Sequence, residues 1–304
     1  MTRTGMEGLY SAIEDAAALL DVRVSRDKVW PILTTYEDAL PRLVVAFRAT
    51  TRGTGDLDCR FTALPADVNP YAFAVSRGIA PPTDHPVGTL LADVQGKLPI
   101  TAHGVDFSVV DGFKKTWTFL PVNDLQKLSK LADLPSMPPS LAANFDFYTR
   151  YGLDDKNSMI GIDYPSRTVN VYFLQAPAEC REPRTVRAML SELGLPDPSE
   201  QMLELAGRAV GIYTTLSWDS QKIERITFAT MVPDMEAFPA RVPVPPEIEK
   251  FAKNVPYTYP GAGQGLYNVA SHPGGEYFKL QTYHQLGEGS LEARVLLGSA
   301  GSAR

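Results

Sequence analysis

Five predicted β-hairpins, regularly spaced along the chain, constrain the fold more than any other feature of the sequence. Each hairpin consists of two segments in which apolar and polar residues alternate, joined by a turn that contains Gly, Pro or Asp. The hairpins recur about every 60 residues, as expected of a repeat architecture. The ten predicted strands span residues 43–50, 56–64, 104–110, 113–119, 158–163, 168–174, 210–218, 223–232, 265–270 and 277–285.

Amphipathic segments with helical spacing lie between the hairpins. The predicted helices span residues 6–20, 26–39, 85–97, 125–134, 139–151, 182–193, 199–208 and 246–254. We therefore predict an α+β fold, in which five αββα units form a ten-stranded antiparallel β-barrel with the helices outside. Closure of the barrel removes the sheet edges. A barrel of this size is too wide for side chains to fill, so the ligand site is expected in its lumen.

The composition narrows the possible ligands and the cellular location. The chain has 29 Lys and Arg against 35 Asp and Glu, a balance that disfavours nucleic acid as a partner. The two cysteines are too few for a disulfide framework. The first 22 residues predict an amphipathic helix rather than a signal peptide, and no apolar run is long enough to span a membrane. We expect one domain over residues 1–304, cytoplasmic and monomeric, with residues 298–304 as a flexible tail.

Several strands carry a single cation accompanied by aromatic rings rather than by acids. Lys115 is an example, because alternation places it on one face with Phe113 and Trp117, and places Lys114 on the opposite face with Thr116 and Thr118. Such a mixed face is compatible with a solvated sheet surface. If helices cover the outside of the barrel, the mixed face instead lines the lumen.

Arg225 and Lys279 lie in similar surroundings on two later strands. A lumen built in this way has a cationic zone beside an aromatic zone. Lys and Arg bind phosphate through charge-assisted hydrogen bonds, and aromatic faces stabilise a nearby cation. This combination suits a substrate with an anionic head and a hydrocarbon or aromatic body.

Several sequence segments, in order along the chain, carry a family resemblance. They include RDKVWPILTTYED, HPVGTLLADVQGKLP, GFKKTW, VNVYF, TLSWDSQKIER and EYFKL. On these segments the chain resembles the ABBA-type aromatic prenyltransferases of the NphB/CloQ group, which act in secondary metabolism. The resemblance implies transfer of a geranyl or dimethylallyl group from its diphosphate to an electron-rich aromatic acceptor, a hydroxynaphthalene, phenol or phenazine, by Friedel–Crafts substitution. It implies no organic cofactor.

The resemblance also implies roles for individual residues. The diphosphate is expected to be held by Lys115, Asn170, Tyr213, Arg225 and Lys279. Rings that flank the prenyl chain and acceptor are expected at Trp117, Tyr172 and Tyr283. The rest of the substrate pocket is expected to be lined by Met159, Leu174, Gly211, Ala229, Leu266 and Gln281. Asp58 is expected to contact Mg²⁺, as an optional ion.

Some alternatives stay open at this stage. Gln281 stands where similar family members have Gly, so it either narrows the lumen or adds a hydrogen-bond partner for the acceptor. Asp58 is also compatible with a simple ion pair to Arg60. Ser166 replaces a family lysine that helps to hold the diphosphate. For the whole protein, the alternatives are a non-catalytic carrier of a prenylated or aromatic metabolite and a structural barrel with a wet lumen.

Overall fold

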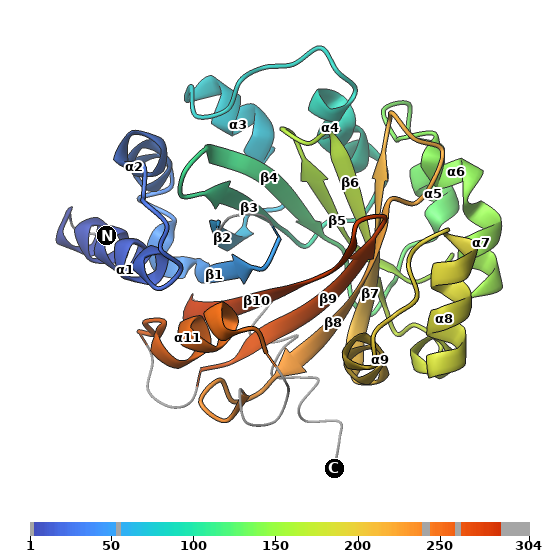
Figure 1. Ribbon diagram of the computed structural model, residues 1–304. Helices are drawn as coiled ribbons and strands as arrows, with labels where there is room; N and C mark the ends of the chain where they lie inside the picture. Colours follow the sequence, from blue (N-terminus) through green and yellow to red (C-terminus); the bar gives the residue numbers. More distant parts are fainter. Residues whose placement is uncertain (1–2, 53–55, 239–243, 259–262, 287–304) are drawn as a thin grey trace.

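The computed structural model describes residues 3–52, 56–238, 244–258 and 263–286. Its centre is a closed barrel in which each strand pairs antiparallel with its neighbours in the chain and β1 pairs with β10 (Figure 1). The ten-stranded antiparallel barrel predicted from the hairpins is therefore confirmed. The strands are β1 Val44–Thr50, β2 Leu57–Leu64, β3 Ala102–Ser108, β4 Gly112–Phe119, β5 Asn157–Asp163, β6 Thr168–Leu174, β7 Ala209–Ser217, β8 Arg225–Val232, β9 Gly265–His272 and β10 Gly275–Gln285.

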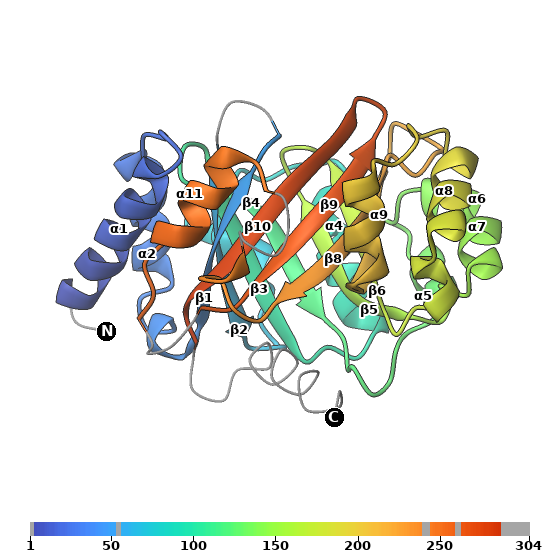
Figure 2. The same cartoon turned by 60° about the horizontal axis from the view of Figure 1, so that its bottom comes forward.

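Helices surround this barrel on its outer side (Figure 2). Among them, α9 packs against β8 and β9, and α11 against β1 and β10. The helices are α1 Arg3–Ala18, α2 Arg26–Thr35, α3 Pro70–Ser76, α4 Val87–Lys97, α5 Leu128–Ala132, α6 Ser140–Ala143, α7 Phe145–Arg150, α8 Pro183–Glu192, α9 Glu200–Gly207 and α11 Pro246–Asn254, with 3₁₀ turns η1 Leu40–Arg42 and η2 Ala178–Arg181.

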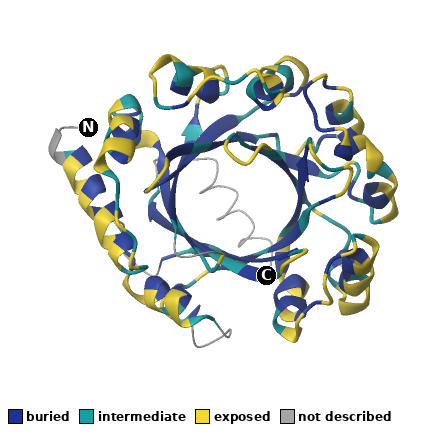
Figure 3. Cartoon of the chain, turned by 45° about the horizontal axis from the view of Figure 1, so that its top comes forward, coloured by how far each residue is buried: buried dark blue, intermediate teal, exposed yellow. Residues whose placement is uncertain are grey.

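The hydrophobic core is the layer between the barrel wall and the helices. Outward-facing strand residues such as Phe47, Phe61 and Phe228 are fully buried there against the apolar faces of the helices. The helices show their buried side to the barrel and their exposed side to solvent (Figure 3). Because successive side chains of a strand alternate between faces, the remaining half of the strand residues point into the lumen.

Helix α3 was missed by the sequence analysis, although the chain carries a start signal for it. The Asn69 side chain caps this helix by accepting a hydrogen bond from the Ala72 amide, and Pro70 follows at the first helical position. The predicted helix 139–151 is divided into α6 and α7 at Asn144. The tail expected at residues 298–304 lies outside the described residues.

A β-bulge in β4 changes the face assignment made from strict alternation. Lys115 pairs with Asp106 of β3, but Phe113 pairs with Phe107, so Lys114 is an extra residue in β4. As a consequence Phe113 lies on the outer face, with its ring centroid 6.4 Å from that of Tyr71 in α3. The Lys114 ammonium reaches Asp58 at 3.0 Å. The prediction that Phe113 shares the face of Lys115, with Lys114 on the opposite face towards the helices or solvent, was wrong.

Candidate active site

The lumen contains a cavity of about 460 Å³, a volume within the range of about 300–1,000 Å³ usual for small-molecule sites. Residues from all the strands except β3 contribute to its wall. Its lining includes every residue predicted to flank the prenyl chain or acceptor: Trp117, Met159, Tyr172, Leu174, Gly211, Ala229, Leu266, Gln281 and Tyr283. Tyr213 and Lys279, predicted to hold the diphosphate, line it as well.

Lys115, Arg225 and Lys279, here called the cationic zone, lie on the inner faces of β4, β8 and β10. Lys279 donates a 2.8 Å hydrogen bond to the Tyr213 hydroxyl. Lys279 and Arg225 also share an aromatic neighbour, Tyr277. The centroid of the Tyr277 ring lies 5.2 Å from the Lys279 ammonium and 5.9 Å from the Arg225 guanidinium. The three cations therefore converge on one end of the lumen, and none of them forms an ion pair with a described carboxylate.

The pKa values of the two lysines report the same crowding of positive charge. Burial, together with Arg48 and Arg225, lowers the pKa of Lys115 to about 7, although Asp163 and Asp106 oppose the shift. Burial and the charges of Arg225, Arg48 and Lys115 hold the pKa of Lys279 well below its usual value. An anion bound between these groups would relieve both effects, so the zone is suited to a multiply charged anion.

Asn170 faces the same part of the lumen from β6. Its amide oxygen accepts a 2.8 Å hydrogen bond from the Thr215 hydroxyl, and its amide nitrogen donates to the Tyr172 hydroxyl at 3.3 Å. These contacts fix the amide in orientation. Lys115, Asn170 and Arg225 lie beside the cavity rather than in its lining.

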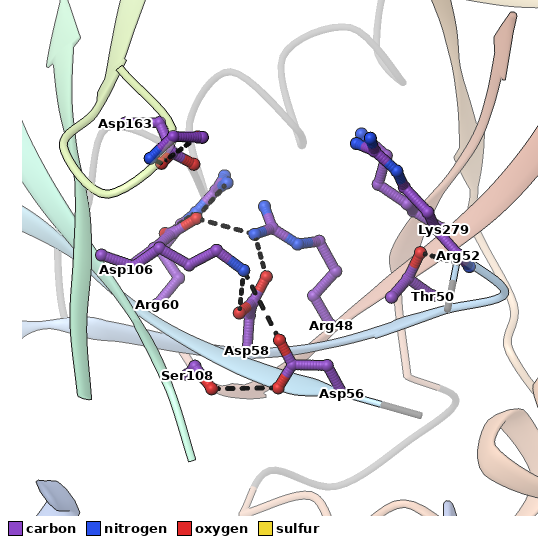
Figure 4. Close-up of polar contacts among 12 residues, drawn as sticks. Arg48, Thr50, Arg52, Asp56, Asp58, Arg60, Asp106, Ser108, Asp163 and Lys279 are labelled. Atoms are coloured by element: carbon purple, nitrogen blue, oxygen red, sulfur yellow. Dashed lines mark hydrogen bonds and ion pairs between the residues drawn. The ribbon is translucent and has the colours of Figure 1, made fainter. Parts of the chain in front are cut away.

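Two arginines in the cavity wall were missed as site residues by the sequence analysis. Arg48 and Arg60 both line the cavity and both contact Asp106, at 3.0 and 2.7 Å. Figure 4 shows the two guanidinium groups converging on this carboxylate from β1 and β2. The sequence does contain a signal for these two arginines. Alternation places Arg60 on the same face of β2 as Asp58, and the hairpin register places Arg48 opposite Asp58.

The contacts of Asp58 favour an ion pair over a magnesium site. One carboxylate oxygen is bound by Arg48 (Figure 4), and the other is bound by Lys114. Burial acts to raise the pKa of Asp58, but Arg48 and Lys114 outweigh it and hold that pKa below its usual value. Both oxygens already have cationic partners, so these residues do not fit Mg²⁺. Within the described ranges no group of three His, Cys, Asp or Glu side chains is placed to bind a metal ion.

Aromatic rings continue the wall from the cationic zone into the cavity. The rings of Tyr172 and Tyr213 stack with their centroids 4.3 Å apart, and Trp117 meets Tyr172 edge-on at 5.1 Å. The Trp117 ring also contacts two cations, the Arg60 guanidinium at 3.9 Å and the Lys115 ammonium at 4.4 Å. Burial raises the pKa of both Tyr172 and Tyr213, so their hydroxyls are neutral.

A cationic zone that opens onto an aromatic cavity is the arrangement expected of an enzyme for prenyl diphosphates. The model of the family described as "Aromatic prenyltransferase Orf2" matches residues 4–294. The chain belongs to this family. Because the match extends over nearly the whole chain, it covers all the site residues described above.

Similar proteins of known activity support the assignment. The chain is 48% identical to a flaviolin linalyltransferase of Streptomyces virginiae, over 92% of each chain. It is 49% identical to a furaquinocin biosynthesis prenyltransferase of Streptomyces sp. (strain KO-3988), covering 91% of this chain and 89% of the relative. It is 47% identical to a 5,10-dihydrophenazine-1-carboxylate 9-dimethylallyltransferase of Streptomyces anulatus, covering 91% and 92%.

Solved structures support the fold independently of close sequence similarity. PriB in a binary complex with product diphosphate matches with a TM-score of 0.52 at 12% identity, covering 91% of this chain and 96% of that chain. A 5-dimethylallyltryptophan synthase from Streptomyces coelicolor matches with a TM-score of 0.50 at 10% identity, covering 90% and 95%.

The chain is thus an aromatic prenyltransferase, and the alternative of a non-catalytic carrier barrel is not supported. Within the described part of the chain, no helix combines the length and the apolar character needed to cross a bilayer.

Proposed function

We propose that this prenyltransferase moves a geranyl or dimethylallyl group from its diphosphate to a carbon of an electron-rich hydroxynaphthalene, phenol or phenazine. The observation that carries the proposal is the direct contact between the cationic zone and the aromatic wall, made by the Lys279–Tyr213 hydrogen bond and by Lys115 against Trp117. The named activities of the relatives, linalyl transfer to flaviolin and dimethylallyl transfer to a dihydrophenazine carboxylate, fit this substrate range. The product would belong to secondary metabolism.

The cationic zone has the task of stabilising the leaving group. As the allylic C–O bond breaks, negative charge grows on the departing diphosphate, and the charges of Lys115, Arg225 and Lys279 are already in place to receive it. Hydrogen bonds from Tyr213 and Asn170 would complete the clamp. Arg48 and Arg60 extend the positive region along the cavity wall, and their contacts to Asp106 hold them in position.

The rings beyond the clamp shelter the allylic cation until the acceptor attacks. Tyr172, Tyr213 and Tyr283 present ring area to the cavity. Trp117 already has Arg60 and Lys115 against its ring, so we assign it mainly to the apolar wall.

The acceptor ring then forms the new C–C bond and loses one proton to restore aromaticity. The cavity lining contains no carboxylate or imidazole from the described residues. We therefore assign this proton to water or to the released diphosphate.

Two further properties belong to the proposal. Because Asp58 is neutralised by Arg48 and Lys114, we propose that turnover proceeds without Mg²⁺. We also propose that the protein is cytoplasmic and acts as a monomer, since residues of a single chain suffice to line the cavity.

The experiment is incubation with geranyl or dimethylallyl diphosphate and a panel of dihydroxynaphthalenes, hydroxynaphthoquinones, phenolic acids and phenazines, with Mg²⁺ or with EDTA. Mass spectrometry is expected to find a prenyl adduct, with one diphosphate released per adduct, under both conditions. A protein that binds the diphosphates but forms no adduct with any of these acceptors would contradict the proposal.

A further inference from the structure

Two buried amides in the cavity wall take no part in the mechanism proposed above, and the sequence left open whether Gln281 narrows the lumen or bonds the acceptor. Asn268 of β9 is 7% exposed and Gln281 of β10 is 3% exposed, and both line the cavity. Their strands are adjacent, with Asn268 opposite Lys279 and Gln281 opposite Leu266. The two amides are therefore diagonal neighbours on the lumen face, at positions about 7–8 Å apart, within reach of side chains of this length.

The hydrogen-bonding capacity of these amides is largely unused. The Asn268 side chain makes no hydrogen bond to any described residue, and Gln281 makes one, from its amide nitrogen to the Tyr283 hydroxyl at 3.1 Å. Two other neutral polar side chains of the cavity wall have protein partners, since Ser158 donates to the Tyr172 carbonyl and Gln175 to the Val122 carbonyl, whereas the Trp117 indole N–H has none among the described residues. Buried polar side chains are normally hydrogen-bonded, so two amides aimed into one cavity point to a ligand.

The chemistry of the two substrates decides which of them the amides serve. A prenyl diphosphate carries all its polar atoms on the head group, which belongs at the cationic zone, and its tail has no hydrogen-bonding group. Gln281 donates to the Tyr283 hydroxyl and so lies among the rings of the cavity, and Asn268 lies between Gln281 and Lys279 at the border of the cationic zone. On the ring side of that border, the aromatic acceptor is the substrate that offers polar atoms to the two amides. An amide both donates and accepts, so it matches a phenolic hydroxyl or a quinone carbonyl and requires no charge on the acceptor.

We propose that Asn268 and Gln281 form an amide pair that binds a polar ring substituent of the aromatic acceptor, a hydroxyl or a carbonyl group. This inference rests on the proposed function. By fixing that substituent, the amide pair selects oxygenated acceptors and determines which ring carbon faces the allylic cation. Both residues are specificity determinants and take no part in breaking the C–O bond.

The test compares a dihydroxynaphthalene with the naphthol that lacks its second hydroxyl, at saturating geranyl diphosphate. A site that hydrogen-bonds the second hydroxyl prefers the diol, and we expect a ratio of kcat/KM of about tenfold or more in the unmodified protein. In Asn268→Leu and Gln281→Met, the ratio is expected to fall towards one through a higher KM for the diol. The isomer distribution of the diol product is expected to broaden, as seen by chromatography.

The controls separate this inference from folding and from the proposed function. Gln221→Met makes the same chemical change on an exposed turn residue and is expected to keep the ratio. The dissociation constant of geranyl thiolodiphosphate is expected to stay within about twofold in both cavity variants, which also shows that they fold.

An equal use of diol and naphthol by the unmodified protein would overturn the inference without the need for any variant. So would an unchanged ratio and isomer distribution in both cavity variants. Absence of product with every acceptor in the unmodified protein would instead mean that the proposed function has failed.

Discussion

Lys115 is the residue on which the account of the diphosphate site depends most. It is 6% exposed, it contacts Trp117 through a cation–π interaction, and no described carboxylate forms an ion pair with it. Desolvating an ammonium group without a carboxylate partner is unfavourable for folding. Such a group is retained where a ligand supplies the missing negative charge.

Replacement of Lys115 by methionine tests this at the residue scale. Lys115→Met is expected to lower kcat/KM for the donor by about 100-fold, since loss of one preorganised contact to developing charge costs about 3 kcal/mol. The free energy of unfolding should be equal or higher, because a desolvated charge has been removed. Retained activity in a folded Lys115→Met protein would exclude Lys115 from the clamp.

The pH dependence of donor use follows from the same residue. With the pKa of Lys115 lowered to about 7, the free protein loses this charge as the pH rises above that value. kcat/KM for the donor should therefore fall above about pH 7, by up to tenfold per unit, while kcat changes less because bound diphosphate keeps the lysine protonated. Initial rates between pH 6 and 10 measure both, and a profile in Lys115→Met identical to that of the unmodified protein would contradict the assignment.

The lowered pKa of Lys115 also affects the free energy of unfolding. Whereas kcat/KM for the donor is expected to fall as the pH rises, the free energy of unfolding is expected to increase. The unfolded chain keeps the proton up to the usual lysine pKa of 10.5, whereas the folded chain releases it above about 7. Between these values the unfolded state binds more protons, so Lys115 makes the unfolding free energy rise with pH, by at most about 1.4 kcal/mol per unit. Denaturant titrations of the unmodified protein and Lys115→Met should differ in this slope.

At the scale of elements, the bulge in β4 explains where sequence-based prediction succeeded and where it failed. The boundaries of all the strands were predicted to within a few residues, because each outer face is apolar and each turn has recognisable chemistry. A bulge adds one residue to a strand without changing the apolar outer face or the turn residues. The position of Lys114, whose side chain reaches Asp58, was therefore not predictable from the sequence. Alternation and the hairpin register place Arg48 and Arg60 on one face with Asp58, but their contacts to Asp106 involve β3, a strand outside that hairpin, and the sequence analysis missed them.

The site was predictable chiefly where family resemblance named the residue. All the pocket residues named in this way line the cavity. Asn268 was not named, because a single Asn in a strand carries no signal until the register places it opposite Lys279.

A glycine on β5 gives a prediction at this scale. A Cβ atom at Gly161 would lie 2.6 Å from Cε of Lys115 and 3.0 Å from the Trp117 ring. Gly161→Ala should therefore displace the flexible lysine and raise the donor KM by about tenfold or more, with kcat reduced as well. Gly96→Ala in α4, where nothing lies within 4 Å, is the control and should leave both constants unchanged. Equal kinetics for the two variants would show that the position of Lys115 is unimportant.

The ion pairs that join β1, β2 and β4 through Asp58 give a further prediction at the scale of elements. Asp58→Asn leaves Arg48 and Lys114 without the carboxylate that they share, and it should lower the unfolding free energy by about 3 kcal/mol. If Asp58 has only this structural role, the loss of stability and any loss of activity will be the same with Mg²⁺ as with EDTA. A Mg²⁺-dependent activity that Asp58→Asn abolishes would restore the metal role.

At the scale of the whole molecule, the barrel lets an acidic protein bind a strongly anionic substrate. The net charge is −6, so the overall field does not attract a diphosphate. The strands instead concentrate Lys115, Arg225 and Lys279 inside one end of the lumen, where burial strengthens their effect on a bound anion. The cavity beyond them then keeps water from the allylic cation.

The most direct test of this arrangement is a crystal structure with geranyl thiolodiphosphate and an unreactive acceptor analogue. We predict diphosphate oxygens within hydrogen-bonding distance of Lys115, Arg225 and Lys279, and a geranyl chain that runs along Tyr172 and Tyr213 into the cavity. A diphosphate bound outside the lumen, or a prenyl chain directed away from this cavity, would contradict the account.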